Sequence, residues 1–420
     1  MTSFRVLRMM VARSLRQHAV STFVTVLSVA LASGLVLSIY AIESQARLAF
    51  TAGPTGYDAV LGARGSQLQL VLNTVFHLET SPGNIPWSLY EAVKKDDRVE
   101  LAVPYAVGDN YKGFRIVGTT LDAFPKSESN AAGALTPGAG RLFDPGCREA
   151  VVGSFVAERT GLIVGSKIHP YHDLVYDERL KHDEEYVVVG IRAPTNTPSD
   201  RVVWIPIEGI FRMTGHVLRG TGDTYVAKAT EEIPDASKEI SAVMLKLKPW
   251  AMGFQLQQTI NLQGKVATLA WPVSTVMADL FDKLGWVYRV LTLVANLVCV
   301  VAAASILASI YNTINERRRE FAILRALGAR KSTVFAVIVM ESAAISALGA
   351  LAGFAVYVAV MLGAAAVVRA QTGVVVEIFR FHPVLVLAPV GMTALGALCG
   401  LVPAFKAYRT DVAANLAPSS

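Results

Sequence analysis

Three histidines and five carboxylates lie close together in one short segment of the sequence. His169, His172 and His182 fall within 14 residues, and the carboxylates beside them are those of Asp173, Asp177, Asp183, Glu184 and Glu185. Neutral imidazoles and carboxylates together suit a divalent ion such as zinc. The three histidines are therefore a candidate metal site. The alternative, which the spacing favours, is a solvated loop between two strands, since no two of these histidines have helical i, i+4 spacing.

A basic segment with an apolar stripe is the second candidate site. Residues 315–331 read Asn-Glu-Arg-Arg-Arg-Glu-Phe-Ala-Ile-Leu-Arg-Ala-Leu-Gly-Ala-Arg-Lys. Phe321, Leu324 and Leu327 recur at i, i+3 and i+6, which predicts a short amphipathic helix, and Gly328 is well placed to end it. A helix this short cannot fold a core of its own. It must lie on the bilayer as a basic interfacial anchor or insert its stripe into a groove of a partner protein.

The common catalytic and nucleotide-binding motifs are missing from the sequence. It contains no G-x-S-x-G, H-E-x-x-H or C-x-x-C pattern, and no G-x-x-x-x-G-K-[ST] loop. We therefore expect a protein that is not an enzyme, binds no cofactor of its own and cannot by itself hold a nucleotide in a Walker-type loop.

The composition indicates where these two candidate segments must be held. Of 420 residues, 53% are hydrophobic and only 17% are charged, with a mean hydropathy of +0.43. Soluble domains carry about 25% charged residues, so an ordinary cytosolic enzyme and a disordered chain are both excluded. The apolar residues are concentrated in one block near the N-terminus and three near the C-terminus, which is typical of an integral membrane protein with one large water-exposed part.

The four apolar blocks predict four transmembrane helices. About 20 residues suffice to cross the hydrocarbon core, and the first block has 24 consecutive residues without a charge. Its length and the lack of a small-residue cleavage site favour an uncleaved anchor over a signal peptide. The predicted spans are residues 19–42, 286–311, 333–368 and 383–405.

The distribution of Lys and Arg predicts the orientation of these spans. Segments 1–18, 312–332 and 406–420 together hold 12 basic and 3 acidic residues, whereas residues 43–289 hold 25 basic and 28 acidic residues. Short cytoplasmic segments are enriched in Lys and Arg, so we expect both termini and the 312–332 loop in the cytoplasm. Residues 43–285 and the 369–382 loop are then outside. The net charge of +6 reflects topology and does not predict a nucleic-acid partner.

The predicted external domain, 43–285, has mixed α/β patterning. Short runs rich in Val, Ile and aromatic residues predict strands at 57–61, 99–107, 114–118, 150–153, 186–191, 201–207 and 243–247. Helices are expected after Pro86, at 154–160 before Gly161, from Pro249 to about Leu262, and at 274–284 leading into the second span. The overall expectation is an integral membrane α-helical protein whose α+β domain, divided into two lobes near 133–146, lies between the first and second helices. Cys147 is the only cysteine outside the spans, so no internal disulfide is expected there.

The sequence from Glu316 to Arg330 resembles the coupling segment of permeases of the MacB/LolC/FtsX superfamily of ABC transporters, the type VII or mechanotransmission class. The family pattern E-R-x-R-E-x-x-[IL]-x-[RK]-A-[LI]-G-A is followed there, as here, by an apolar span with an early Glu, which is Glu341 in this chain. Segments 13–40, 152–165 and 403–411 also resemble family motifs. Unlike MacB itself, this chain has no fused ATPase domain, so a separate ATPase is expected.

The resemblance implies a mechanism and a set of partners. Two permease chains, identical or sister chains, would pair in a bacterial inner membrane, and two ATPase subunits carrying ATP and Mg²⁺ would bind their cytoplasmic faces. A coupling helix would pass the closure of the ATPase dimer through the second span to the periplasmic domain, without a wide channel. The residues that the resemblance assigns to the ATPase contact are Glu320, Phe321, Leu324, Arg325, Leu327 and Gly328.

Polar and small residues inside the spans are further candidates. Glu341 is a carboxylate within the third span, where a charge is costly, and we expect it to pair with Arg325 or Arg330; the alternative is a role in gating or substrate passage. Two small-xxx-small motifs allow close helix approach. These are Gly349 with Gly353 and Gly396 with Gly400, for which we expect packing of spans three and four within one chain more than use at a dimer seam.

Three functions remain open from the sequence. The first is an ABC permease subunit that exports or extracts a hydrophobic, peptide or lipoprotein cargo. The second is a non-transporting regulator that uses ATP-driven motion to switch a periplasmic partner, and the large external domain argues against it. The third is a component of a metal-linked, zinc-type ABC system, which only the three histidines support.

Overall fold

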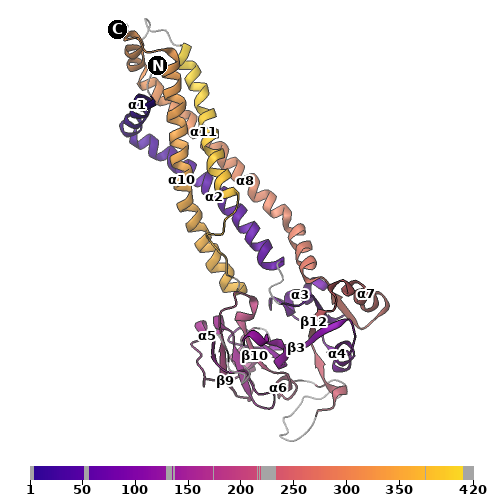
Figure 1. The fold of residues 1–420 in the computed structure, drawn as a ribbon. Helices are drawn as coiled ribbons and strands as arrows, with labels where there is room; N and C mark the ends of the chain where they lie inside the picture. Colours follow the sequence, from indigo (N-terminus) through magenta and orange to yellow (C-terminus); the bar gives the residue numbers. More distant parts are fainter. Residues whose placement is uncertain are drawn as a thin grey trace. The chain divides into compact units, whose positions relative to one another are not determined.

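The computed structural model of the chain combines long helices with a domain of strands and short helices (Figure 1). It describes residues 4–51, 56–128, 135, 138–173, 175–214, 216, 218, 233–373 and 375–409. Two compact units are present and are described separately: a helical unit of residues 1–46, 284–366 and 377–420, and an α/β unit of residues 47–283 and 367–376. The part of the predicted 406–420 tail that follows Arg409, with Asp411, lies outside the described residues.

Four helices in the described part of the chain are long and apolar enough to cross a membrane. They are α2 (Ala19–Thr51), α8 (Val273–Glu316), α10 (Lys331–Thr372) and α11 (Val384–Arg409), and their most apolar windows have mean hydropathies between 2.1 and 2.5. Because lipid offers no hydrogen-bond partner, a spanning segment must satisfy its own peptide groups, as a continuous helix does. The four predicted membrane helices are confirmed. The amphipathic segment predicted at 274–284 forms the first turns of α8, a single helix of 44 residues.

Glycines let the membrane helices approach closely within one chain. A Cβ added at Gly353 would lie 2.9 Å from the Cβ of Ser33 and 3.1 Å from the carbonyl oxygen of Ala30, both on α2. Gly349 meets α2 in the same way, at Val29. The second pair packs elsewhere. Gly396 and Gly400 of α11 lie against α10, where they meet serine side chains. Packing of spans three and four thus involves the second pair only, whereas the first pair packs spans one and three.

We expect replacement of Gly353 by leucine to lower the stability of the helical unit by about 1–3 kcal/mol or more, because the new side chain would overlap backbone as well as side-chain atoms of α2. The midpoint of thermal unfolding in detergent measures the loss. Gly363→Leu is the matched control, since it lies on the same helix and a Cβ there would meet no heavy atom within 4 Å. Equal midpoints for the two variants would contradict the assigned packing.

In the described residues, the α/β unit is built on a mixed sheet of eleven strands. The order along its main path is β13-β1-β12-β3-β4-β10-β6-β9-β5, with β7 paired to β9 and β8 paired to β3. The pairs β10–β4 and β6–β9 are parallel, and the other pairs are antiparallel. The strands are β1 (Ala59–Ala63), β3 (Val99–Tyr111), β4 (Phe114–Thr119), β5 (Gly138–Gly140), β6 (Glu149–Val152), β7 (Lys167–Ile168), β8 (Tyr171–His172), β9 (Tyr186–Arg192), β10 (Val202–Pro206), β12 (Ala242–Leu247) and β13 (Ala267–Ala270). A separate two-stranded ribbon pairs β2 (Ile85–Pro86) with β11 (Glu239–Ile240).

Short helices connect these strands. They are α3 (Gln67–Thr74), α4 (Trp87–Lys94), α5 (Ser154–Thr160), α6 (Ile207–Phe211) and α7 (Gly253–Gln257), the last continued by a π-helical turn at Gln258–Gln263. Local sequence explains their ends. The Ser66 side chain caps α3 by accepting from the Gln69 N–H, and α5 ends at Gly161, whose φ of +73° is the left-handed conformation that glycine adopts easily.

One hydrophobic core runs through the α/β unit. It contains buried side chains from both ends of the sheet, including Leu61 of β1, Val152 of β6 and Val243 of β12. The 13-residue strand β3 explains this continuity, because it pairs with β12 through its first half and with β4 and β8 through its second. Among the described residues, the predicted division into two lobes is therefore not observed. Part of the expected boundary at 133–146 lies outside the described residues, and β5 of that stretch joins the sheet.

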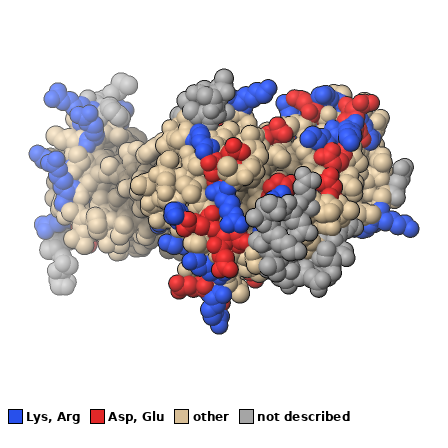
Figure 2. Space-filling model, turned by 90° about the horizontal axis from the view of Figure 1, so that it is seen from below, with Lys and Arg blue, Asp and Glu red and all other residues tan. Residues whose placement is uncertain are grey.

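Basic and acidic side chains stand next to one another in the middle and right of Figure 2, whereas the fainter left end carries mainly basic ones. In the α/β unit such neighbours form ion pairs at the surface, such as Lys246 Nζ to Glu100 Oε1 at 2.9 Å and Lys167 Nζ to Glu185 Oε1 at 2.7 Å. Exposed pairs of this kind contribute little stability, about 0–1 kcal/mol each. They make the surface of the unit polar and of mixed sign.

Candidate functional site

The predicted coupling segment forms a separate helix in the helical unit, α9 (Arg318–Ala326). Helix α8 ends at Glu316, and Arg317 leaves the helical conformation between the two helices. At the other end, Gly328 has φ +96°, its N–H donates to the Arg325 carbonyl, and the Ala329 N–H donates to the Leu324 carbonyl. These two bonds form a Schellman motif, which gives Gly328 the C′ position that its place in the sequence predicts.

The apolar residues of α9 lie on two different faces. Phe321 is 7% exposed and Leu324 is half-buried, and both pack into the core of the helical unit. Ile323 and Leu327 are 44% and 80% exposed. The predicted stripe of Phe321, Leu324 and Leu327 is thus divided, since only its last member is open to a partner. The open apolar face consists of Ile323, Ala326 and Leu327. The exposed Arg319 flanks it, and counting from Arg319 the three apolar residues are at i+4, i+7 and i+8.

A buried polar cluster joins the start of α9 to α1 (Phe4–Gln17) and α10. Ser14 of α1 donates from Oγ to Oε1 of Glu341 at 2.5 Å and accepts from Nη1 of Arg317 at 2.6 Å. The same Arg317 Nη1 lies 3.7 Å from Glu341 Oε2, and its Nε donates to Glu320 Oε2 at 2.9 Å. Ser14, Arg317 and Glu341 are 1%, 7% and 4% exposed. The cation opposite Glu341 is therefore Arg317, where the sequence predicted Arg325 or Arg330.

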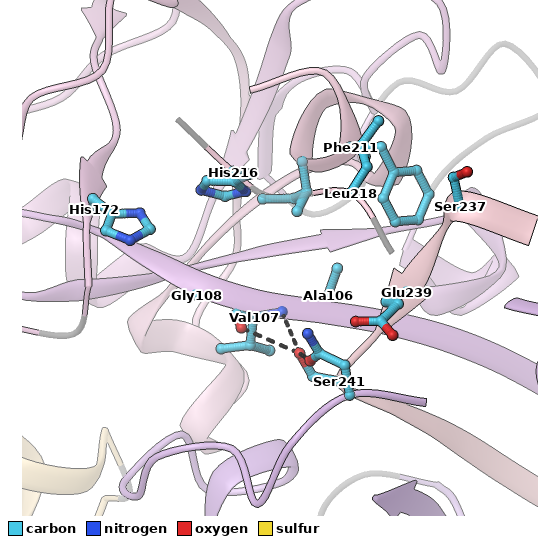
Figure 3. A pocket seen from close by; sticks show the side chains of 12 residues that line it. Ala106, Val107, Gly108, His172, Phe211, His216, Leu218, Ser237, Glu239 and Ser241 are labelled. Atoms are coloured by element: carbon cyan, nitrogen blue, oxygen red, sulfur yellow. Dashed lines mark hydrogen bonds between the residues drawn. The ribbon is translucent and has the colours of Figure 1, made fainter. Parts of the chain in front are cut away.

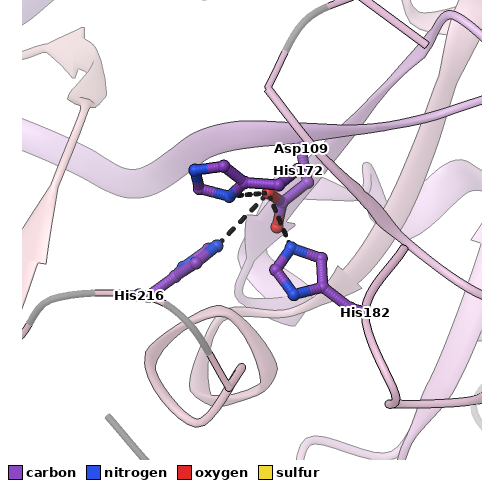
Figure 4. Close-up of side chains that lie close together, drawn as sticks. All are labelled: Asp109, His172, His182 and His216. Atoms are coloured by element: carbon purple, nitrogen blue, oxygen red, sulfur yellow. Dashed lines mark hydrogen bonds and ion pairs between the residues drawn. The ribbon is translucent and has the colours of Figure 1, made fainter. Parts of the chain in front are cut away.

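In the α/β unit, one aspartate gathers three histidines. Oδ1 of Asp109 lies 3.4 Å from Nδ1 of His172, 3.4 Å from Nε2 of His182 and 3.2 Å from Nε2 of His216 (Figure 4). All four ligand-type atoms lie within 4.8 Å of one another. Asp109 is fully buried, and the exposed fractions of the His182, His216 and His172 side chains rise from 7% to 18% to 52%. We name these four residues the His₃Asp cluster.

The sheet positions two members of the His₃Asp cluster directly. In the β3–β4 pairing the register shifts at Gly108, just before Asp109. A bulge of this kind re-aims the next side chain. Asp109 then lies opposite His172 across the β3–β8 pair. Next to it, Asn110 donates from Nδ2 to the carbonyl oxygens of Tyr171 and Asp173, the two neighbours of His172, at 3.3 and 2.8 Å. The backbone on both sides of His172 is thereby tied to the strand that carries Asp109.

The third imidazole is oriented by hydrogen bonds behind it. Nδ1 of His182 lies 2.9 Å from the Thr214 carbonyl oxygen, and the Thr214 N–H and hydroxyl both donate to Oε1 of Glu184, at 2.9 and 2.8 Å. A carbonyl oxygen can only accept, so Nδ1 carries a proton and a neutral ring presents the lone pair of Nε2 to the cluster. Glu184, which is buried, fixes the segment that holds this ring and leads to His216.

Electrostatics in the His₃Asp cluster favour a charged carboxylate. Burial acts to raise the pKa of Asp109, but the three imidazoles around its carboxylate outweigh it and hold that pKa well below the usual range. The hydrogen bond to Asp109 raises the pKa of His172. For His182, burial acts to lower the pKa and the interaction with Asp109 outweighs it, so the net shift is upward. The cluster is thus a negative centre surrounded by imidazole nitrogens.

A cavity adjoins the His₃Asp cluster. It has a volume of about 290 Å³, and His172 and His216 form part of its wall (Figure 3). The other lining residues are Asn84, Ala106, Val107, Gly108, Ile210, Phe211, Leu218, Ser237, Glu239 and Ser241. The wall is therefore partly apolar and partly polar, and two of the four cluster residues can contact a molecule placed in it.

Comparison with known proteins identifies the family of the chain. The family model described as the MacB-like periplasmic core domain matches residues 22–249, which is more than half of the chain. The chain belongs to the MacB-like family of ABC permeases. A second model, described as the FtsX-like permease C-terminal, matches residues 292–412, and so covers most of α8 together with α9, α10 and α11. This MacB-like permease is an inner-membrane protein with an α/β domain between its first two membrane helices.

The curated relatives of the MacB-like permease are longer proteins. The macrolide export ATP-binding/permease protein MacB of Azoarcus sp. (strain BH72) is 28% identical over 268 residues, and that of Hyphomonas neptunium is 25% identical over 223 residues. These matches cover 61% and 52% of this chain but only 37% and 30% of the relatives. Among solved structures, the periplasmic region of MacB from Actinobacillus actinomycetemcomitans covers 56% of this chain and 97% of its own, at 10% identity and a TM-score of 0.31.

The structure brings two of the three predicted metal residues together. His172 and His182 belong to the His₃Asp cluster, whereas His169 is outside it, with Nε2 3.7 Å from Oε2 of Glu185. Sequence reasoning missed Asp109 and His216. Asp109 follows the end of the predicted strand at Val107, and the Gly-Asp-Asn sequence there resembles a turn, although the strand continues to Tyr111. No local pattern in the sequence marks Asp109 as a site residue. His216 lies 34 residues beyond His182 and gives no local signal.

Proposed function

We propose that the MacB-like permease is the transmembrane subunit of an ABC transporter that couples ATP hydrolysis on a separate ATPase to movement of its periplasmic α/β domain. The cargo class we propose is hydrophobic, peptide or lipoprotein. Both termini and α9 face the cytoplasm, and ATP and Mg²⁺ are bound by the ATPase. A second permease chain completes the assembly. The observation that carries this proposal is α9 itself, a short helix with one buried and one open apolar face.

The open face of α9 supports an ATPase contact. Ile323 and Leu327 expose large apolar side chains next to the exposed Arg319 and Glu320. Apolar residues at i and i+4 with charges beside them are the pattern that a helix presents to a groove. Since the opposite face packs Phe321 into the core of the helical unit, a push on the open face is transmitted to the bundle and is not absorbed by a loose loop.

The cluster of Ser14, Arg317 and Glu341 supports a route for that movement. Arg317 lies at the α8–α9 junction, and its guanidinium contacts Ser14 of α1 and Glu341 of α10. A rotation of α9 therefore displaces a side chain that two other helices share. Helix α8 begins at Val273 and is continuous up to this junction, so its far end would move with it. In this proposal α8 carries the movement toward the periplasmic domain.

The experiment that tests the proposal changes Leu327 on the open face. We expect Leu327→Asp to lower recovery of an ATPase at least about tenfold, because the variant loses the burial of one leucine, worth about 1.5–3 kcal/mol, and would place a charge in the groove. The readout is affinity purification of the tagged chain from native membranes with a non-hydrolysable ATP analogue, followed by mass spectrometry. Equal recovery of ATPase from Leu327→Asp and from the unchanged chain would refute the contact.

Two controls make the result specific. Leu327→Met keeps an apolar side chain of similar volume and should retain the ATPase. Because Leu327 is 80% exposed, neither variant should alter membrane insertion or the midpoint of thermal unfolding. A loss of ATPase with unchanged insertion and stability assigns the effect to the open face.

A further inference from the structure

We propose that the α/β domain binds one divalent transition-metal ion, of the Zn²⁺ class, through Asp109, His172, His182 and His216. This site goes beyond the proposed coupling function and does not depend on it, since all four residues belong to the α/β unit, whereas α9 belongs to the helical unit. Its test needs neither the ATPase nor a transport assay. The failure of one proposal therefore leaves the other standing.

The distances around Asp109 are those of co-ligands and are long for charge-assisted hydrogen bonds. Hydrogen bonds between an imidazolium and a carboxylate measure about 2.7–2.9 Å. The three nitrogen-to-Oδ1 distances here are 3.2, 3.4 and 3.4 Å. Zinc binds imidazole nitrogen and carboxylate oxygen at about 2.0–2.2 Å, and the edge of a tetrahedron with such bonds is about 3.3–3.5 Å. The three distances to Oδ1 thus already match three of the six edges. The other three edges join the nitrogens, which lie within 4.8 Å of one another and need only small side-chain rotations to reach the tetrahedral distance.

Two buried atoms of the cluster have no hydrogen-bond partner in the described part of the chain. They are Nε2 of His182 and Oδ2 of Asp109. Buried polar atoms are normally paired, because the loss of water is otherwise uncompensated. With Nδ1 of His182 donating to the Thr214 carbonyl, the lone pair of Nε2 is aimed at the negative Asp109. A cation beside the Asp109 carboxylate gives Nε2 of His182 the partner it lacks. The carbonyl behind the ring is the usual second partner of a metal-binding histidine.

The ligand set indicates the class of ion. Three imidazoles and one carboxylate suit Zn²⁺ and, with other geometries, Cu²⁺ or Ni²⁺, whereas Mg²⁺ and Ca²⁺ require oxygen ligands. Four protein ligands close a tetrahedral site, which is typical of a structural or sensing ion and not of a catalytic one. His172, at 52% exposed, lies where an ion can enter from solvent, and Asp109 lies at the bottom.

Binding of the ion would join three parts of the α/β unit. Asp109 belongs to β3, His172 to β8, and His216 follows α6. Since His172 and His216 also line the 290 Å³ cavity, occupancy of the site fixes one wall of that cavity. We infer that the metal sets the shape of this cavity, and hence what the domain can hold there.

The test is Zn²⁺ titration of the purified full chain in detergent after removal of metal with a chelator, measured by calorimetry and by metal analysis after gel filtration. We expect one Zn²⁺ per chain. Loss of an outer hydrogen-bond partner alone lowers metal affinity about 10–100-fold, so His172→Ala and His216→Ala should lower it at least about 100-fold. His169→Ala is the matched control: it lies three residues from His172, outside the cluster, and should bind as the unchanged chain does.

A second measurement separates loss of ligand from loss of fold. Co²⁺ should replace Zn²⁺ and give the intense visible absorption of a tetrahedral ion. Added Mg²⁺ should not displace the bound Co²⁺. His172→Ala removes a half-exposed side chain, so its thermal unfolding without metal should match that of the unchanged chain while the Co²⁺ spectrum changes. Absence of stoichiometric Zn²⁺ from the unchanged chain, or equal binding by His172→Ala, His216→Ala and His169→Ala, would overturn the proposal and leave the cluster as histidine–carboxylate ion pairs.

Discussion

Arg317→Met should destabilise the helical unit by about 3–5 kcal/mol. The substitution leaves Glu341, which is 4% exposed, without its cation, and removal of one partner from a buried ion pair has this effect because the other charge stays desolvated. Ser14 alone would remain as a hydrogen-bond donor to the carboxylate. Thermal unfolding of the purified chain in detergent, followed by the loss of helical circular dichroism, measures the change.

The double variant Arg317→Met/Glu341→Leu is the control for this prediction. Replacement of both charges by apolar side chains of similar size is often neutral or stabilising, so the double variant should recover most of the lost stability. If the shared guanidinium transmits movement, the stable double variant still binds an ATPase through Leu327 but no longer couples its hydrolysis to the periplasmic domain. A single Arg317→Met variant as stable as the unchanged chain would show that the ion pair does not hold the three helices together.

The membrane part of the fold could be predicted well from the sequence. A long uncharged segment in lipid must satisfy its own peptide groups, and a helix does so. All four predicted spans coincide with helices. Packing between helices was harder to foresee. Gly349 and Gly353 carry a small-xxx-small pattern that allows a close neighbour but does not say which helix it is, and α2 is the neighbour found. Glu341 posed the same problem, since several arginines lie near it in sequence and only the fold selects Arg317.

For the α/β domain, the sequence predicts the presence of the strands better than the residues at which they begin and end. All seven predicted strands are present, because β-branched and aromatic runs between turn residues are a local signal. The sequence predicts that this strand ends at Val107, because Gly108, Asp109 and Asn110 are typical turn residues, whereas β3 continues to Tyr111. Their polar groups are satisfied by β8 and its neighbours, which no local pattern reveals. Strands β2, β7, β8 and β11 have two residues each, which is too few to show any periodicity in the sequence.

The two candidate sites differ in what the sequence could reveal. For α9, helical spacing correctly predicts a helix ended by Gly328, but it places Phe321 and Leu327 on one stripe. Six residues rotate a helix by about 600°, so the two side chains point about 120° apart, and the core buries only Phe321. For the His₃Asp cluster, two of four residues share one segment and could be found. Asp109 lies 63 positions before His172, and His216 lies 34 positions after His182, so only the folded domain brings them together.

Zn²⁺ should raise the thermal stability of the full chain by an amount that depends on Asp109. An ion that binds the folded α/β domain and not the unfolded chain adds about 2.7 kcal/mol at 100 times its dissociation constant and about 4.1 kcal/mol at 1,000 times. Free histidines of the unfolded chain bind some Zn²⁺ and reduce this gain. The measured quantity is the rise in unfolding midpoint between chelator-treated and Zn²⁺-loaded protein, because this difference cancels any effect of a substitution on the metal-free state.

Asp109→Asn keeps the shape of the side chain and removes its charge, so the increment from Zn²⁺ should fall to near zero. His169→Ala should keep the full increment, since its imidazole lies outside the cluster. Glu184→Gln should fall between the two: it weakens the hold on Thr214, whose carbonyl orients His182, and the expected 10–100-fold loss of affinity corresponds to about 1.4–2.7 kcal/mol of the increment. An increment that is the same in Asp109→Asn, Glu184→Gln and His169→Ala would mean that Zn²⁺ acts elsewhere on the chain, because no site built on Asp109 can lose its anion and bind unchanged.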